Sequence, residues 1–260
     1  MVLDSELGWV EIARLIDAVC AAGEAMALPY IAAQSDLSHA KAMCDQDGRA
    51  YAETRFEWVD PKERYWKNRR LALQAPFLTA ARMTAEPFYY GEGRLTSWRH
   101  TTLLETVDCS CVPGATKIGS AIIAPVHLPQ GVVGAVVWAS RTPIAIEQVF
   151  ATHADHLHGT ALKLLSAHAE VTGRLHHPLA PTMLTRREVQ CLRWAAAGKT
   201  DHEIAIILDL SISTVRFHLR NARDKLGAAG RAQAIQTAAG LGFVGASPRA
   251  EPETEDGLPV

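Results

Sequence analysis

The chain has 260 residues, of which 48% are hydrophobic, and a formal net charge of −2. This length allows two domains, and no apolar run approaches the roughly 20 residues of a membrane-spanning helix. The N-terminus lacks the basic start of a secretory signal, and five scattered cysteines fit reduced thiols better than a disulfide framework. We therefore expect a cytoplasmic protein that does not enter a membrane. No motif for a metal, a cofactor or a catalytic nucleophile stands out, so an enzyme is not expected.

The first predicted elements are a helix over residues 5–27 and a strand over residues 52–58. Apolar side chains at helical spacing indicate the helix, and alternation with Glu53, Arg55 and Glu57 indicates the strand. The positions expected to face the core are Val10, Ala13, Ile16, Val19 and Cys20 in the helix, and Ala52, Thr54, Phe56 and Trp58 in the strand.

A β-hairpin and a long helix follow. The apolar runs at residues 121–128 and 131–139 meet at a Pro-Gln-Gly turn, which predicts a hairpin. Residues 147–175 predict a helix with one buried face, formed by Phe150, Ala154, Leu157, Ala161, Leu164 and His168. Strands flanked by helices favour an α/β/α sandwich over residues 1–175, an architecture that can hold a small ligand between its sheet and its helices.

Large aromatic side chains are frequent between residues 58 and 90. Each single aromatic residue is more often part of a core than of a binding site. As a group they also suit a pocket for an acyl chain with a small polar head. The residues concerned are Trp58, Tyr65, Trp66, Phe77, Phe88, Tyr89 and Tyr90.

Residues 184–245 predict an all-α domain of four helices. Together with the α/β/α sandwich expected over residues 1–175, this gives the fold class α+β. A linker with two prolines, residues 176–183, precedes this domain. An acidic tail, residues 246–260, follows it and is expected to be disordered. Three kinds of feature mark the helix ends: capping-box spacings at Thr185/Glu188 and Thr200/Glu203, a third cap at Ser211, and helix-ending glycines at Gly198 and Gly227.

The third of these helices has an apolar and a basic face. Arg216, Arg220 and Arg223 share an outward face, with the hydroxyls of Ser213 and Thr214 at its N-terminal end. Arginines in this arrangement suit guanine edges in the major groove, and hydroxyls at a helix start suit phosphate. Taken alone, such a basic stripe is more often simply solvated. The apolar face is expected to join Val215, Leu219, Ala222 and Leu226 to Val189, Leu192, Ile204, Ala205 and Leu208.

The basic excess lies only in this C-terminal region. Residues 179–245 hold nine Lys or Arg against five Asp or Glu, whereas residues 1–178 hold sixteen against nineteen. A formal charge of +4 is modest for binding an anionic polymer, so two copies are expected to act together.

This C-terminal segment resembles the four-helix DNA-binding domain of LuxR-type transcription factors. The run CLRWAAAGKT, from Cys191 to Thr200, is especially similar to the quorum-sensing members of that family. The resemblance implies that Arg216 and Arg220 meet base edges. It implies phosphate contacts for Lys199, Thr200, Thr214 and Arg223, and a dimer contact on the fourth helix at Ala234, Ala238 and Leu241.

A looser resemblance relates the N-terminal domain to the autoinducer-binding domain of the same receptors. It is carried by Trp58, Trp66, Pro76, Tyr90, Gly119-Ser120 and the hairpin after Pro125. It implies a pocket for an N-acyl homoserine lactone, and the residues expected to line it are Trp58, Trp66, Ala75, Phe77, Tyr90 and Val137.

The chain departs from that family at the polar positions of the pocket. Trp66 and Tyr90 stand where a tyrosine and a tryptophan are expected, and Lys62 replaces another aromatic residue. Ala75 replaces the aspartate that accepts a hydrogen bond from the ligand amide, and a buried N–H without an acceptor costs about 1–3 kcal/mol. The residues that can supply another acceptor are Ser140, Thr101, Thr102 and Glu105.

These features predict a homodimeric, ligand-responsive regulator that binds a pseudo-palindromic operator in double-stranded DNA. One alternative is an orphan regulator of the same type that needs no acyl-homoserine lactone. A response regulator is a weaker alternative, because the N-terminus lacks the acidic pair of a receiver domain. An enzyme fused to a DNA-binding domain is weaker still.

Overall fold

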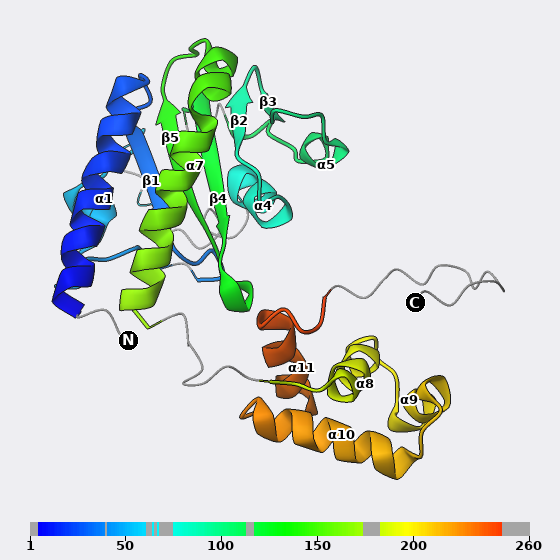
Figure 1. Cartoon of the computed structure of the whole chain (residues 1–260). Helices are drawn as coiled ribbons and strands as arrows, with labels where there is room; N and C mark the ends of the chain where they lie inside the picture. The colour runs from blue at the N-terminus through cyan, green and yellow to red at the C-terminus, as the bar shows by residue number, and fades with distance from the viewer. Residues whose placement is uncertain are drawn as a thin grey trace. The chain divides into compact units, whose positions relative to one another are not determined.

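The computed structural model describes residues 5–39, 41–60, 64, 67, 75–112, 117–173 and 183–245. The chain divides into two compact units, Met1–Leu175 and His176–Val260 (Figure 1). The expected acidic tail and all of the expected linker except Met183 lie outside the described residues. None of the described helices is long and apolar enough to cross a membrane.

The first unit is built on a five-stranded antiparallel sheet. The strand order is β1-β5-β4-β2-β3, with β1 at Tyr30–Gln34, β5 at Val133–Ser140, β4 at Ser120–His127, β2 at Phe88–Gly91 and β3 at Arg94–Thr96. The predicted hairpin is confirmed as β4 and β5, joined by the short 3-10 turn η1 at Pro129–Gly131. An antiparallel sheet differs from the parallel, doubly wound sheet of a receiver domain, which argues against a response regulator.

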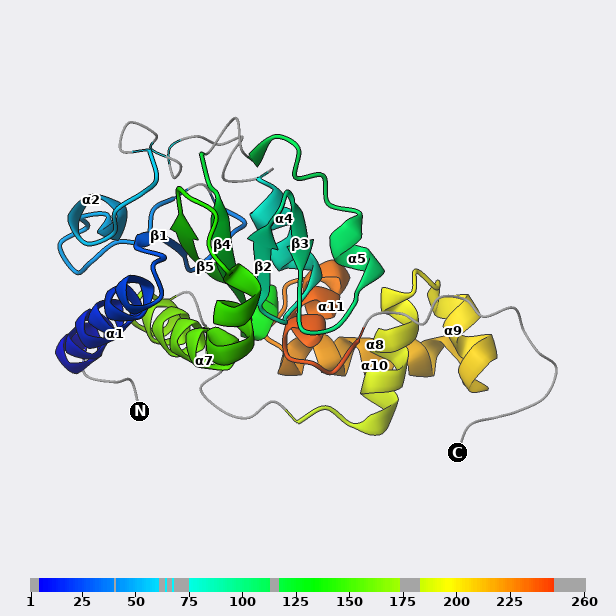
Figure 2. The ribbon, with the colours of Figure 1, turned by 90° about the horizontal axis from the view of Figure 1, so that it is seen from above.

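Helices cover both faces of this sheet, as the sequence predicts. Two long helices, α1 at Ser5–Ala25 and α7 at Ile146–Val171, lie side by side on one face (Figure 2). The helix α4, at Pro76–Met83, packs against β4 and β5, and α5 at Thr102–Glu105 against β3. The short helix α2, at Tyr51–Thr54, contacts β1.

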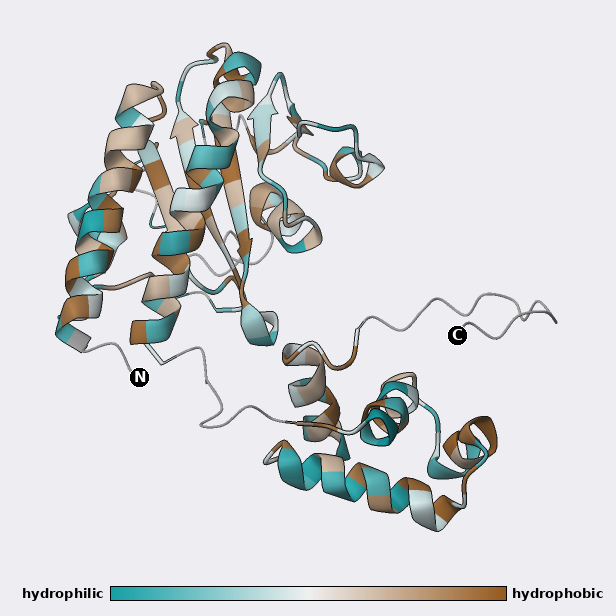
Figure 3. Ribbon diagram, viewed as in Figure 1, coloured by the Kyte–Doolittle hydropathy of each residue, from teal (hydrophilic) through white to brown (hydrophobic). Residues whose placement is uncertain are grey.

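Alternation along the central strands produces two separate cores. Ile122 and Trp138 belong to the cluster under α1 and α7, whereas Ile123 and Val137 belong to the cluster that contains α4. The indole Nε1 of Trp138 donates to the main-chain oxygen of Val19 at 3.0 Å, which satisfies the polar atom of a fully buried side chain. Figure 3 shows how the apolar strands contrast with the mixed outer faces of the helices.

The predicted inner face of α7 is confirmed, whereas that of α1 is confirmed for Ile16 and Val19 and wrong for Val10 and Ala13. All six expected residues of α7 are buried. In α1 the exposed side chains include Val10 and Ala13, while Ile12 and Leu15 are buried beside Ile16. When apolar side chains occur on every side of a helix, as in α1, their spacing fixes the position of the buried face only to within about one residue.

The predicted strand at residues 52–58 is also wrong. Residues 51–54 form helix α2, and Glu57 makes only an isolated bridge to Tyr30. The helical turn buries both Tyr51 and Phe56, whose rings lie 6.1 Å apart. Burial of two aromatic side chains from one turn outweighs the alternating pattern that suggested a strand.

The second unit is a bundle of four helices with the predicted caps. The helices are α8 at Arg186–Ala196, α9 at Asp201–Leu208, α10 at Ile212–Lys225 and α11 at Arg231–Gly240. Both capping boxes form, Ser211 accepts from the N–H of Thr214 at 3.1 Å, and Gly198 and Gly227 adopt positive φ. Each of these three local predictions is confirmed.

Two small cores hold the four helices together. Val215 of α10 packs with Cys191 and Ile204, and Ala222 packs with Leu192 and Ala234. Val189, expected in this core, is only half-buried and belongs to neither cluster, whereas Cys191 and Leu192 of α8 are fully buried. Since α10 contacts all three other helices, its exposed face is held rigidly relative to the rest of the unit.

Candidate functional site

A three-residue turn joins α9 to α10 and sets the direction of α10. Asp209 takes a left-handed conformation with φ of 53°, and its N–H bonds to main-chain oxygens of α9. Asp and Asn tolerate this conformation better than other residues with a Cβ. Ser211 then caps α10, so the chain changes direction within the segment Asp209–Ser211. Two helices joined by such a turn form a helix-turn-helix.

The exposed face of α10 carries a stripe of four side chains. Ser213, Arg216, Phe217 and Arg220 follow one another at helical spacing, and all four are exposed. The opposite face holds the buried Val215 and is turned towards the other helices. In Figure 3 most of α10 is hydrophilic, in contrast to the largely apolar α9. This stripe presents two guanidinium groups and an exposed aromatic ring on one face of the helix.

Six of the seven predicted DNA-binding residues line three open hollows on the second unit. Arg216 lines all three, and the largest has a volume of about 590 Å³. Lys199 and Thr200 line that one, Ser213 and Arg220 line a second, and Arg220 and Arg223 line a third. Thr214 lines none of the three and is half-buried, with its hydroxyl 2.8 Å from Ser211 Oγ. The structure therefore groups the predicted residues around Arg216.

The three arginines of α10 differ in their partners. Arg220 makes no hydrogen bond or ion pair with another described residue, so all its donors are open to a ligand. Arg223 is half-buried and donates to the Asp224 carboxylate from Nε at 3.0 Å and from Nη2 at 2.7 Å. Arg216 donates from Nε to Oδ2 of Asp201 at 3.2 Å. Arg220 thus offers the least compensated charge on this face.

Lys199 and Thr200 are already engaged at the start of α9. The Thr200 hydroxyl accepts from the N–H of Glu203 and donates to the Glu203 carboxylate at 2.8 Å. The same carboxylate lies 3.5 Å from Lys199 Nζ. The backbone hydrogen bond from Thr200, followed by its hydroxyl, lowers the pKa of Glu203 despite some burial. A phosphate at this helix end would have to share Lys199 with that carboxylate.

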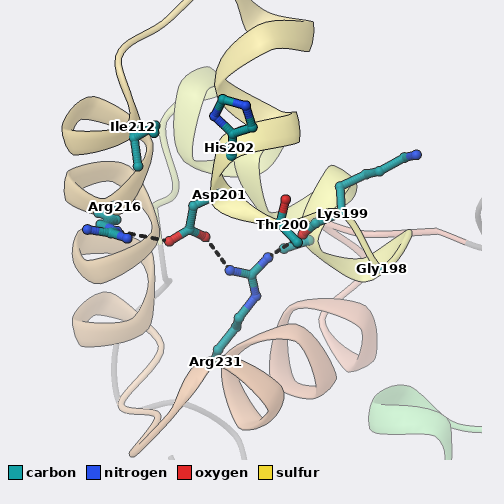
Figure 4. A pocket seen from close by; sticks show the side chains of 9 residues that line it. Gly198, Lys199, Thr200, Asp201, His202, Ile212, Arg216 and Arg231 are labelled. Carbon is teal, nitrogen blue, oxygen red and sulfur yellow. Dashed lines mark hydrogen bonds and ion pairs between the residues drawn. The ribbon is translucent and has the colours of Figure 1, made fainter.

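Sequence reasoning missed two residues of this site, Asp201 and Arg231. Arg231 donates from Nη1 to Oδ1 of Asp201 and from Nη2 to the main-chain oxygen of Lys199 at 2.7 Å (Figure 4). Burial opposes ionisation of Asp201, but hydrogen bonds from Arg231 and Arg216 outweigh it and lower the pKa. In the sequence, Asp201 directly follows the cap Thr200, and an acidic residue is common at a helix N-terminus for that reason alone. Its two arginine partners are distant in sequence, so no local pattern predicts the pairing.

The expected dimer contact on α11 is wrong for two of its three residues. Ala234 is 2% exposed and Ala238 is fully buried, because both pack inside the second unit with Leu192 and Ala222. Leu241 is half-buried. The side chains that α11 leaves on the surface include Ala232, Gln233, Gln236 and Ala239. Any pairing through α11 must use that outer face.

In the first unit, four of the six predicted ligand-binding residues belong to one cluster. Phe77, Tyr90 and Val137 are buried there, and the half-buried Trp58 packs against it. The rings of Phe77 and Tyr90 lie 5.4 Å apart. Ala75 is half-buried and caps the N-terminus of α4, two residues before Phe77. Trp66, and Lys62 with it, lie outside the described residues.

Tyr90 supplies a polar group at this cluster. Burial, then the nearby thiols of Cys109 and Cys111, raise the pKa of Tyr90, so its phenol keeps its proton at neutral pH and can donate. Burial likewise raises the pKa of Cys109, to about 11, and keeps this thiol unreactive.

The structure separates the four residues considered as replacement acceptors. Ser140 is buried on the sheet face under α1 and α7, where its hydroxyl donates to Thr142 O at 2.6 Å. Glu105 is 61% exposed and pairs with His100. Thr102 is exposed, whereas Oγ1 of Thr101 is buried without a hydrogen-bond partner among the described residues. Of the four, Thr101 alone combines burial with an unused polar atom.

Comparison with known proteins finds a family match within the second unit. Residues 182–238 match the family described as bacterial regulatory proteins, luxR family. The chain is 37% identical over 129 residues to the transcriptional activator protein VanR of Vibrio anguillarum, covering 49% of this chain and 52% of VanR. It is 47% identical over 77 residues to VjbR of Brucella abortus, a quorum sensing-dependent transcriptional regulator, covering 30% of each chain.

The chain spans about half or less of the length of these curated relatives. His176–Val260 makes up only about a third of the chain, so the match to VanR must extend into the first unit. Among solved structures, Escherichia coli SdiA is similar, with 23% identity, a TM-score of 0.34 and coverage of 69% of this chain and 71% of SdiA.

Proposed function

We propose that the whole protein is a ligand-responsive transcriptional regulator, because residues 182–238 match the luxR family of bacterial regulatory proteins. It acts as a homodimer inside the cell, where each copy presents one α10 to the major groove of an operator. The half-sites lie about one helical turn apart, as expected for paired helix-turn-helix units. The names of VanR and VjbR, a transcriptional activator and a quorum sensing-dependent regulator, support this proposal.

The observation that carries the proposal is the exposed stripe on α10. Arg216 and Arg220 extend from a helix that is capped at Ser211 and packed by the other three helices. A rigid helix of this kind is what base reading requires, because sequence is read by a few side chains that reach base edges. Ser213 lies at the N-terminal end of the stripe, and Lys199 and Thr200 line a hollow together with Arg216, as phosphate-binding groups would.

The signal molecule in this proposal is an N-acyl homoserine lactone or a related acyl compound. The apolar cluster around Phe77 and Val137 suits an acyl chain, and the Tyr90 phenol suits a carbonyl acceptor. Thr101 Oγ1, a buried oxygen without a hydrogen-bond partner among the described residues, is the proposed acceptor for a ligand amide in place of the missing aspartate. Ligand shifts the protein towards its DNA-binding form only as far as it binds that form more tightly.

One observation favours a second candidate, an orphan regulator that binds DNA without an acyl-homoserine lactone. Ala75 brings a methyl group to the position directly before α4, where the family resemblance calls for a carboxylate. A lactone amide would then lose its charged acceptor, at a cost of about 1–3 kcal/mol unless Thr101 compensates.

The test is expression of the full chain with and without a panel of N-acyl homoserine lactones of different chain length. Soluble yield, melting temperature and the mass of any co-purified ligand are measured, followed by selection of a DNA site from a randomised duplex library. Receptor function predicts a rise in melting temperature with at least one lactone, because a ligand of the folded form stabilises it. A stable ligand-free protein that selects a site, and that no lactone affects, is the orphan regulator. Failure to select any DNA sequence contradicts both candidates.

A further inference from the structure

Asp201 is the centre of an ion-pair chain that joins three helices of the second unit. Its Oδ2 accepts from Arg216 Nε at 3.2 Å, and its Oδ1 accepts from Arg231 Nη1. Arg231 is fixed in turn by the bond from its Nη2 to Lys199 O at 2.7 Å. Figure 4 shows the Asp201 carboxylate between the two guanidinium groups, one from α10 and one from the start of α11.

This contact leaves the outer edge of the Arg216 guanidinium open. Asp201 takes the Nε–H, and neither terminal amino group of Arg216 bonds to another described residue. The side chain of Arg216 is 71% exposed, whereas that of Asp201 is 23% exposed. A guanidinium held through Nε still has two parallel N–H donors, which match O6 and N7 of guanine.

We propose that Asp201, anchored by Arg231, is a positioning residue that holds Arg216 for bidentate recognition of one guanine. A free arginine loses rotamer freedom when it binds, which weakens its contribution. Asp201 removes part of that loss before DNA arrives. This inference rests on the proposed DNA-binding function. It adds that Asp201, by orienting Arg216, determines base preference at one position of the operator.

The charge of Asp201 makes the inference easy to distinguish from simple attraction to DNA. A carboxylate on a DNA-facing surface repels phosphate, so its neutralisation should strengthen binding to any duplex. If Asp201 orients Arg216, the same neutralisation should weaken discrimination at one base pair. A purely structural ion pair predicts a loss of stability with unchanged base preference.

The experiment compares full-length wild type, Asp201→Asn and a matched control, Asp209→Asn. Asp209 is exposed at the other end of α9, and asparagine tolerates its left-handed conformation, so the control removes the same charge without touching Arg216. After selection of the preferred site by wild type, affinities are measured for that site, for each single-base variant and for an unrelated duplex, at several salt concentrations. Thermal unfolding of each variant is recorded alongside.

We expect both variants to bind the unrelated duplex more tightly than wild type. Only Asp201→Asn should lose discrimination at one guanine, by about tenfold. Arg216→Lys, which keeps the charge but lacks the fork, should lose discrimination at the same base pair, and Asp201→Asn should add nothing in that background. Equal base preferences for the two asparagine variants overturn the inference while the proposed function stands. Failure of wild type to select any site overturns both.

Discussion

Nζ of Lys225 lies 2.8 Å from Oε2 of Glu188, and the Glu188 carboxylate is only 3% exposed. The same oxygen accepts from the N–H of Thr185 at 2.7 Å. One carboxylate therefore closes the capping box of α8 and binds the last residue of α10, the helix that carries the exposed arginines.

Removal of the lysine should destabilise the second unit. Lys225→Met leaves the Glu188 carboxylate buried with one partner fewer, at an expected cost of about 1–3 kcal/mol. Hydrogen exchange in the full chain, followed by mass spectrometry of peptides within residues 183–245, measures the loss where it occurs. Lys225→Arg should restore most of the protection. Equal protection in wild type and Lys225→Met would mean that solvent already satisfies the carboxylate.

Acid should weaken this same contact. Burial opposes ionisation of Glu188, but hydrogen bonds from Lys225 and Thr185 prevail and lower its pKa. Its stabilisation is therefore complete above the ordinary glutamate pKa of roughly 4.3 and is lost as the pH falls through the lower folded value. Protection of α8 should fall on acidification in wild type and fall less in Glu188→Gln. Glu203→Gln, at the 44% exposed equivalent position, should change this pH dependence less.

Local chemistry explains why the second unit was predictable and the interactions around Arg216 were not. Thr185, Thr200 and Ser211 each cap a helix through a bond to a residue three positions later, so local spacing in the sequence is enough to predict these helix starts. The pairing of Asp201 with Arg231 joins residues thirty positions apart and depends on how α11 packs. Likewise, the turn that forms α2 is determined by burial of Tyr51 and Phe56, which no local pattern reveals.

Arg220 should carry sequence discrimination because it has no competing partner among the described residues. Arg220→Ala is expected to cost about 1–3 kcal/mol on the selected operator and to relax preference at one base pair. Binding assays on single-base operator variants measure both effects. Arg193→Ala removes an equal charge from the exposed end of α8 and should leave base preference unchanged. A uniform loss across all sequences would reassign Arg220 to phosphate.

Phe217 should recognise a thymine methyl group. Phe217 is 51% exposed and lines the same hollow as Arg216 and Arg220. Apolar side chains in the major groove contact the methyl group of thymine, and its loss should cost about 1 kcal/mol. Replacement of each operator thymine by deoxyuridine should weaken wild-type binding at one position. Phe217→Ala should bind the two operators equally, and persistence of the methyl effect in that variant would assign it to another residue.

Thr101 should affect ligand binding and protein stability in opposite directions. Its buried Oγ1 has no partner among the described residues, so Thr101→Val removes an unsatisfied polar atom and should leave the free protein equally or more stable. If the hydroxyl accepts from the ligand amide, the same change should weaken binding about tenfold, or about 1–3 kcal/mol. The measurement is the melting shift given by the most effective lactone of the panel, titrated into each variant. The adjacent, exposed Thr102→Val is the matched control and should behave as wild type. An undiminished shift in Thr101→Val would mean that the ligand bonds elsewhere, and a less stable free protein would mean that the hydroxyl is already satisfied without ligand.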